Sequence, residues 1–546
     1  MAFWDFFQKE RTIAKPGFNR WLVPPAALAI HLCIGMAYGF SVFWLPLSKA
    51  IGVQEAVACP ENMSFVAKIF TTTCDWPISM LGWMYTLFFV FLGSSAAIWG
   101  GWLEHAGPRK AGVVSALCWC GGLVISALGV YLHQIWLLWL GSGVIGGIGL
   151  GLGYISPVST LIKWFPDRRG MATGMAIMGF GGGAMIGAPL ANRLMSTFAS
   201  SSSVGVWQAF LMLAGIYFIF MVGGALAYRI PPSGWQPAGW APAAGSTNRM
   251  ITLKHVHLSK ILKIPQFWLI WGVLCLNVTA GIGIIGMASP LLQEVFGGKL
   301  IGIQLGFNEL SVDQIGQIAI IGASFTGLLS LFNIAGRILW ASLSDFIGRK
   351  ATYAAFFIFG ILLYALTPTF GSTGSLALFV GAFCIIVSMY GGSFATIPAY
   401  LADMFGTQMV GAIHGRLLTA WSTAGVLGPV LVNYIREYQL ANGVSRANAY
   451  DTTLYILAGL LVLGLLLNMM IKPVADEHFM TDEELTEEKV VASDRSVAEG
   501  FSKSNQSIGK SSGSPLIVVI LAWLAVGIPL AIGFGYTLQQ AVLLFG

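Results

Sequence analysis

The chain has 546 residues, of which 56% are hydrophobic and only 10% are charged, and its mean hydropathy is +0.76. A soluble domain carries roughly 25% charged residues, so the composition excludes a soluble, secreted or disordered protein and indicates a lipid bilayer as the main surroundings. The net charge of +6 does not indicate a nucleic-acid partner, because the basic residues lie in short segments between apolar runs and form no single patch.

Apolar runs long enough to cross a membrane fill most of the chain. A helix of about 20 apolar residues spans a hydrocarbon core of about 30 Å. The runs lie near residues 21–47, 78–101, 111–131, 136–162, 171–192, 207–229, 266–292, 314–341, 351–370, 374–402, 411–435, 451–471 and 515–546. This pattern predicts an all-α polytopic membrane protein.

Lysine and arginine residues fix the expected orientation. With the N-terminus inside, the segments on that side contain 17 of these residues and the outer loops contain 6. Because positive residues collect on the cytoplasmic side of membrane proteins, we expect a cytoplasmic N-terminus, and we place the protein in a bacterial inner membrane.

The runs and the polar segments between them divide the chain into five parts. We expect an amino-terminal six-helix bundle (1–229), a cytoplasmic linker (230–265), a carboxy-terminal six-helix bundle (266–472), an acidic cytoplasmic tether (473–514) and a thirteenth transmembrane helix (515–546). Within the linker, the basic amphipathic stretch Met250–Lys263 is expected to lie along the inner membrane surface.

An internal repeat relates the two bundles. Five residue pairs are separated by a constant 241 positions: Glu104 and Asp345, Gly107 and Gly348, Pro157 and Pro398, Gly170 and Gly411, and Gly187 and Gly428. Parallel repeats of this kind are typical of transporters in which the substrate binds between the halves and access alternates by rocking.

Two loops at the repeat positions carry a recognisable motif. Residues 100–110 read GGWLEHAGPRK and residues 341–350 read ASLSDFIGRK. They resemble the loop signature of the major facilitator superfamily. We expect Glu104 and Asp345 to accept hydrogen bonds from the N-terminus of a neighbouring helix and to pair with Arg109 and Arg349, which would latch the helices together while the site faces outward. The alternative is a plain turn with solvated charges.

Four further motifs narrow the resemblance. WFPDRRG at 164–170, PQFW at 265–268, NIAGRILW at 333–340 and GGSFATIP at 391–398 resemble the oxalate/formate antiporter family. The resemblance covers about residues 20–472 and does not explain the thirteenth helix. It implies the major facilitator fold of two pseudo-symmetric six-helix bundles and a small carboxylate as substrate.

Arg337 is the outstanding candidate for a binding residue. It lies eight residues before Asp345, so the helical rise places it about 12 Å from the inner surface. A cation at that depth costs about 2.5–3.5 kcal/mol, and no Asp or Glu lies at the same depth in any predicted span. A substrate anion is the expected counter-charge, since a guanidinium suits a carboxylate; the alternative is an arginine bonded to helix carbonyls.

The family resemblance adds roles for other residues. It implies that Arg337 contacts the carboxylate, and it places Trp421 where the bacterial oxalate exchanger has a second cation, a lysine. This departure favours a monocarboxylate such as lactate, pyruvate, glycolate, acetate or formate. Arg416 either snorkels to the inner interface or reaches the cavity as a second cation.

The resemblance also implies an aromatic lining of the cavity. The corresponding positions are Tyr38, Tyr154, Phe180, Tyr390 and Phe394. Such rings can form gates around a small anion, and tyrosine hydroxyls can donate to it. The alternative for each is packing between helices.

A histidine in the first helix and two cysteines in an outer loop each allow two interpretations. His31, about 15 Å into the first helix, either carries a proton or is bonded to a neighbouring helix. Cys59 and Cys74 in the outer loop 48–77 either form a disulfide in an oxidising periplasm or are two free thiols.

Together these features favour a secondary carrier for small organic anions, acting by exchange or by proton symport. The sequence has no P-loop, no catalytic grouping and no metal-ligand spacing, so neither an enzyme nor a cofactor is expected. The alternatives are an oxalate/formate exchanger, a carrier of another solute in which Arg337 is structural, and a sensor or assembly subunit without transport. A monomer is favoured, although the sequence does not determine the oligomeric state.

Overall fold

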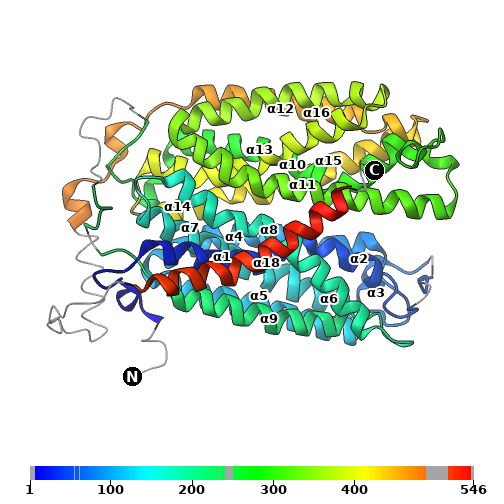
Figure 1. Cartoon of the computed structure of the whole chain (residues 1–546), viewed down its shortest axis with the longest axis horizontal. Coiled ribbons are helices and arrows are strands. Elements are labelled where there is room, and N and C mark those ends of the chain that lie inside the picture. Colours follow the sequence, from blue (N-terminus) through cyan, green and yellow to red (C-terminus); the bar gives the residue numbers. More distant parts are fainter. Residues whose placement is uncertain are drawn as a thin grey trace.

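The computed structural model describes residues 7–53, 56–60, 62–232, 234–239, 250–486 and 514–542. In this part of the chain, 13 helices are long and apolar enough to cross a membrane. They run side by side along the long axis of the molecule (Figure 1), and the described residues contain two isolated β-bridges and no strand. The predicted all-α architecture is confirmed.

The amino-terminal half contains six spans, of which two are divided. The first consists of α1 (Val23–Ile34), a 3-10 segment (Gly35–Phe43) and α2 (Trp44–Leu47). The fourth consists of α6 (Ile135–Leu138), a π-helical segment (Trp139–Gly146) and α7 (Gly147–Trp164). The others are the single helices α4 (Ile78–Ala106), α5 (Pro108–Tyr131), α8 (Arg169–Phe198) and α9 (Val206–Ala227).

The carboxy-terminal half repeats this arrangement. Its single helices are α10 (Pro265–Phe296), α11 (Val312–Ile347), α12 (Arg349–Ser372), α13 (Leu376–Phe405) and α16 (Asp451–Met470). The fifth span of this half is divided into α14 (Val410–Leu417) and α15 (Thr419–Ala441). In Figure 1, α5 and α9 lie in the lower bundle, and α12 and α16 lie in the upper bundle.

The repeat is visible in the turns as well as in the helices. Gly107 ends α4 with a φ of 82°, and Gly348 ends α11 with a φ of 87°. Only glycine adopts this conformation without strain. The repeated glycines therefore build the same tight turn in each half, directly after Glu104 and Asp345.

Part of the linker between the halves packs against the carboxy-terminal half. Of the stretch Met250–Lys263, only Leu258–Lys263 is helical, as a short 3-10 turn. The Val256 amide donates to the Phe405 carbonyl at the end of α13, and the side chains of Val256 and Ile261 are buried. The apolar side of the linker thus packs against the protein, because backbone bonds hold it there.

The start of the predicted acidic tether is docked on this linker. Asp476 forms an ion pair with Lys254 at 2.6 Å, and Glu484 forms one with Lys260 at 2.8 Å. The hydrogen bond from Lys260 lowers the pKa of Glu484. The rest of the tether, residues 487–513, lies outside the described residues.

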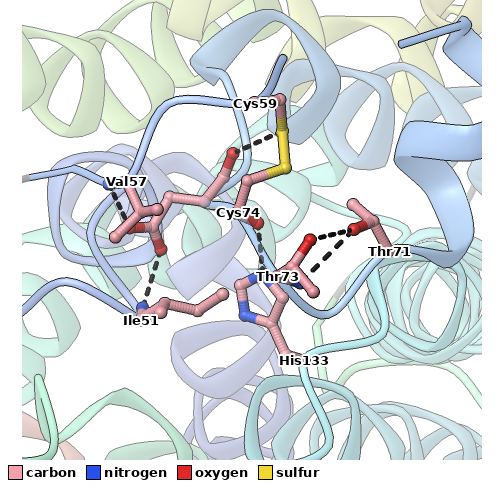
Figure 2. Close-up of a disulfide and its surroundings, with 8 residues drawn as sticks. Ile51, Val57, Cys59, Thr71, Thr73, Cys74 and His133 are labelled. Carbon is pink, nitrogen blue, oxygen red and sulfur yellow. Dashed lines mark hydrogen bonds between the residues drawn. A yellow bond between two sulfur atoms is a disulfide. The ribbon is translucent and has the colours of Figure 1, made fainter.

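A disulfide joins Cys59 and Cys74 in the loop before α4 (Figure 2). The neighbouring carboxylate of Asp75 organises the same loop, because it accepts the amides of Ile51 at 2.7 Å and Val57 at 2.9 Å. The loop is therefore held both covalently and by hydrogen bonds to a buried acid.

His133, in the turn after α5, ties this loop to the helices. Its ring stacks on Trp76 with centroids 4.0 Å apart. Its Nε2 lies 2.9 Å from the Cys74 carbonyl (Figure 2). Burial lowers the pKa of His133, against the opposite effect of that hydrogen bond. The imidazole is therefore neutral at pH 7.

The thirteenth helix, α18 (Leu516–Val542), crosses the two bundles in Figure 1. Leu530 covers Gly182 of α8, and Thr537 lies against Gly327 of α11. The helix thus contacts both halves along one edge, and most of its other large apolar side chains are exposed.

Candidate functional site

We call the end of the molecule that carries Glu104 and Asp345 the latch end, and the opposite end the cavity end. The latch end lies at the left in Figure 1, where the N-terminus is marked. The Asp345 carboxylate accepts the amides of Gly170 at 2.8 Å and Met171 at 3.0 Å, in the first turn of α8, where the helix dipole favours a negative charge. Arg349 donates to the same carboxylate at 2.6 Å, so this copy of the motif joins the two halves.

The Asp345 contact continues into a larger ionic network. Arg349 also donates to Asp403 of α13 at 3.0 Å, and Arg169 of α8 donates to the other oxygen of Asp403 at 2.8 Å. Asp345, Arg349 and Asp403 all belong to the carboxy-terminal half, whereas Arg169 comes from the amino-terminal half. The network therefore closes this side of the latch end with alternating charges.

The second copy of the motif is built differently from the prediction. Glu104 accepts the amide of Gly411 at 3.1 Å, which is the repeat counterpart of the Asp345–Gly170 bond. Its ion pair, however, is with Lys163 of α7 at 2.8 Å, where Arg109 was expected. Arg109 is buried in the first turn of α5. The lysine reaches Glu104 from the adjacent helix, which the loop motif alone could not indicate.

Further hydrogen bonds join the two halves between the latch end and the cavity. Thr173 of α8 donates to the Ala395 carbonyl of α13 at 2.6 Å. Ser422 of α15 donates to the Phe89 carbonyl of α4, also at 2.6 Å. The two halves are thus bonded on both sides of the central pathway.

A cavity of about 580 Å³ opens between the halves on the other side of these contacts. Its walls come from both halves and include Tyr38, Tyr85, Ile282, Asn333 and Val426. The molecule is therefore hollow toward the cavity end and closed toward the latch end.

Arg337 of α11 lies buried at the base of this cavity. Its Nε donates to Asn333, a cavity-lining residue, at 2.9 Å, and its Nη1 donates to the Ile177 carbonyl of α8 at 3.3 Å. The side chain is 0% exposed, and its Nη2 has no hydrogen-bond partner among the described residues. No ion pair with a carboxylate is found for it in this part of the chain. The guanidinium thus keeps an unmatched positive charge next to the cavity.

The aromatic residues predicted from the resemblance surround this guanidinium. The rings of Phe180 and Phe394 lie 5.8 and 5.7 Å from its central carbon. Trp421, which is 0% exposed, contacts the same two rings at centroid distances of 5.5 and 4.5 Å. Tyr154 packs against Trp421 at 5.3 Å. The structure therefore brings Arg337 and its predicted aromatic partners into one cluster.

A pair of tyrosines joins the two halves at the same level. The hydroxyls of Tyr38 and Tyr390 are 3.0 Å apart, although the residues are 352 positions apart in the chain. Tyr38 and Tyr154 both interact electrostatically with Arg337. The hydroxyl groups of these tyrosines can therefore act as hydrogen-bond donors or acceptors near the guanidinium.

Of the two other candidate residues, His31 borders this cluster, with its ring 5.4 Å from that of Tyr154, whereas Arg416 lies outside it. Nδ1 of His31 forms a short contact with the Ala176 carbonyl, and Nε2 lies 3.3 Å from the Tyr154 carbonyl. Arg416 donates to the Leu258 carbonyl of the linker at 2.6 Å. Its guanidinium therefore points to the latch-end surface and not into the cavity.

Sequence reasoning missed three residues that the structure places in the pathway. Asn333 stands four positions before Arg337, so helical spacing could have identified it. Asp403 and His414 carry no comparable signal, because their neighbours come from distant parts of the chain.

The fold and this site define the class of the protein: two repeat-related six-helix halves enclose a cavity that is closed at one end, which is the architecture of a secondary transporter. The model of the Major Facilitator Superfamily matches residues 27–429 and 308–546. The chain belongs to this superfamily and is a membrane transporter, not an enzyme.

Two relatives are about one-quarter identical to the chain over the aligned residues. The oxalate:formate antiporter of Oxalobacter formigenes is 25% identical over 411 residues, which cover 75% of this chain and 83% of the relative. Apicoplast pyruvate carrier 1 of Toxoplasma gondii is 25% identical over 453 residues, covering 71% of this chain and 78% of the relative.

Solved structures share the fold at lower identity. The proton:xylose symporter XylE has a TM-score of 0.56 and 16% identity, covering 83% of this chain and 96% of that chain. The human organic anion transporter MFSD10 has a TM-score of 0.55 and 15% identity, covering 83% of this chain and all of that chain (100%). These likenesses concern the fold alone.

Proposed function

We propose that this transporter carries small monocarboxylates and that Arg337 binds their carboxylate group. The observation that supports this most directly is the buried guanidinium, which has an unbonded Nη2 and no carboxylate partner among the described residues. A cation in such surroundings is stabilised by an anion, and the guanidinium fork suits a carboxylate. Tyr38 and Tyr390 can donate hydrogen bonds to the same ligand.

The charge and the walls of the site favour a monoanion. Arg337 is the one cation that the described residues place in the aromatic cluster, and Trp421 occupies the position where a second cation was considered. Formate, pyruvate, lactate and glycolate each need one cationic partner, whereas a dianion needs two. The names of two relatives, which mention formate, oxalate and pyruvate, support small carboxylates as the broader substrate class.

Alternating access follows from the two ends of the molecule. With a cytoplasmic N-terminus, in a bacterial inner membrane, the latch end faces the cytoplasm and the cavity opens outward. The carboxylates of Glu104 and Asp345 must release the helix N-termini before the latch end can open. Substrate exchange and proton-linked symport both use this cycle.

Counterflow in proteoliposomes tests the proposal. Vesicles are loaded with unlabelled formate, pyruvate, lactate or oxalate, and the entry of labelled pyruvate is followed. Monocarboxylates are expected to drive counterflow, and oxalate is expected to drive little. Strong counterflow with oxalate would favour oxalate/formate exchange instead, and no counterflow with any anion would favour a sensor or assembly subunit.

A further inference from the structure

His414 of α14 is a buried imidazole that no hydrogen bond satisfies. The residue is 1% exposed, and neither Nδ1 nor Nε2 has a hydrogen-bond partner among the described residues. Buried polar groups are nearly always bonded, and leaving one unpaired costs free energy. A partner gained in another state of the transporter would resolve this exception.

The position of His414 is in the pathway between the latch and the Arg337 cluster. It lies one helical turn beyond Gly411, whose amide bonds to Glu104. Its ring faces Tyr154 of the other half at a centroid distance of 5.8 Å. Tyr154 in turn packs on Trp421, whose Nε1 also has no partner among the described residues. Opening of the latch end would separate these halves and admit water to the imidazole.

The internal repeat shows that packing does not require this unbonded group. The counterpart of His414 at the offset of 241 residues is Thr173. The Thr173 hydroxyl lies 2.9 Å from the Gly170 carbonyl and 2.6 Å from the Ala395 carbonyl. The same position is thus fully satisfied in one half and unsatisfied in the other.

Among the described residues, the charged groups around α14 leave the imidazole without a counter-ion. The titratable group that interacts electrostatically with it is His31 of α1. The elements packed against α14 contribute Glu104 (α4), Tyr154 and Lys163 (α7), Asp403 (α13) and Lys260 (Leu258–Lys263). The charged members of this set are already ion-paired: Glu104 with Lys163, Asp403 with Arg169 and Arg349, and Lys260 with Glu484. An imidazolium in the closed state would therefore be a buried, uncompensated charge.

We propose that His414 is a proton-binding site of the transport pathway, which fills when the latch end opens and must empty before it closes again. The inference rests on the proposed carrier function only in requiring that the latch end opens. A bound proton places a second positive charge on the route between Arg337 and the latch-end surface. It thereby links the protonation of the transporter to the direction in which the site faces.

The size of the effect follows from treating the proton as a ligand of the open state. An imidazole in water has a pKa near 6.5. A ligand that binds one state favours that state by the factor 1 + [L]/Kd, which is about 11 at pH 5.5 and about 1.1 at pH 7.5. Acidification over this range should therefore raise the ratio of latch-open to latch-closed molecules about tenfold.

Electron–electron distance measurements test this without any substrate. Spin labels are attached at Leu226→Cys and Met470→Cys, which are exposed near the latch ends of α9 and α16 in different halves. The full-length protein is used in lipid nanodiscs, with its free cysteines replaced by serine or alanine. The parent should show the tenfold change between pH 7.5 and pH 5.5. The variants His414→Asn and His414→Thr, the latter copying the other half, should show none.

His31→Asn is the comparison variant, because His31 is the other buried imidazole near the Arg337 cluster and its ring nitrogens face the carbonyls of Ala176 and Tyr154. This variant should keep the pH response. An unresponsive parent, or a response that survives in both His414 variants, would overturn the proposal. A response lost in His31→Asn and kept in His414→Asn would move the proton site to His31. Failure of pyruvate counterflow with an intact pH response would contradict the carrier proposal but not this one.

Discussion

Two interfaces between the halves are related by the repeat, yet they differ in chemistry. In one, α8 packs on α11, and a Cβ at Gly174 would lie 2.6 Å from the Arg337 carbonyl. In the other, α14 packs on α4, and a Cβ at Gly415 would lie 2.2 Å from the Ala96 carbonyl. The glycines correspond at the offset of 241 residues, as do Arg337 and Ala96. The close backbone packing is thus symmetric, whereas the cation is present on one side.

The asymmetry explains how a duplicated fold could bind one small ligand. A pair of matching interfaces allows the halves to rock against each other, because small residues let the helices approach closely. A single arginine, placed in one interface, breaks the symmetry at the site. Under the proposed function, movement depends on both interfaces and recognition depends on the α8–α11 interface.

Removing the cation should reduce transport more than any of the other changes. Arg337→Gln deletes the charge in the α8–α11 interface, and the loss of two charge-assisted hydrogen bonds to a carboxylate is worth about 3 kcal/mol or more. We expect labelled pyruvate uptake in proteoliposomes to fall about 100-fold. Arg416→Gln is the matched control, since that guanidinium bonds to the linker, and it should transport normally. Equal losses in both variants would contradict the assignment of Arg337.

Adding a cation to the opposite half of the site should change its selectivity. Trp421 is the repeat counterpart of Phe180, and the two rings are in contact at 5.5 Å. Trp421→Lys would provide a second positive charge for a dianion, whereas with a monocarboxylate the lysine would remain a buried unpaired charge. Uptake assays should show loss of pyruvate transport and measurable binding of oxalate or malonate. Trp421→Gln enlarges the cavity without a charge, so a gain of oxalate binding there would attribute the effect to space alone.

The two latches should differ in strength. Asp345 accepts two amides and is coupled through Arg349 to Asp403, whereas Glu104 accepts one amide and pairs with the more exposed Lys163. The two carboxylates are similarly shielded, but Arg349 is 9% exposed and Lys163 is 27% exposed, and an ion pair generally contributes less as its charges become exposed. We therefore expect Asp345→Asn to shift the latch end toward the open state much more than Glu104→Gln. The Leu226/Met470 spin-label distance measures the shift, and an equal shift in both variants would show that the network beyond Asp345 adds nothing.

Deleting the thirteenth helix should have the smallest effect on transport, because α18 lies along the α8–α11 side of the described structure. Along α18, Leu530 covers Gly182 and Gly533 lies near Met185, both on α8, and Trp523 donates to the Trp21 carbonyl at 3.1 Å. The repeat is already complete at Met470, so a chain without residues 514–546 should fold and transport at an unchanged rate per molecule. Quantified membrane levels and pyruvate uptake test this. A well-folded truncated protein without uptake would make α18 part of the transport machinery.

Much of the fold was predictable because its signals are local. The apolar runs identify the spans, since length and hydropathy alone satisfy the bilayer. Paired positions such as Gly107 and Gly348 identify the repeat, because a turn with positive φ needs glycine in both halves. Arg337 was identifiable because a charge deep in an apolar helix is costly wherever the helix packs.

Tertiary structure decided which side chains meet. Lys163 pairs with Glu104, and Tyr38 meets Tyr390, because helices distant in sequence pack side by side. The linker is held on the end of α13 because its backbone amides find carbonyl partners there. His414 is unbonded for the same kind of reason: hydrogen bonding depends on what the opposite helix presents, and helical periodicity carries no information about that helix. The sequence by itself thus determined the spans, the repeat and the buried cation, and the packing between helices determined their partners.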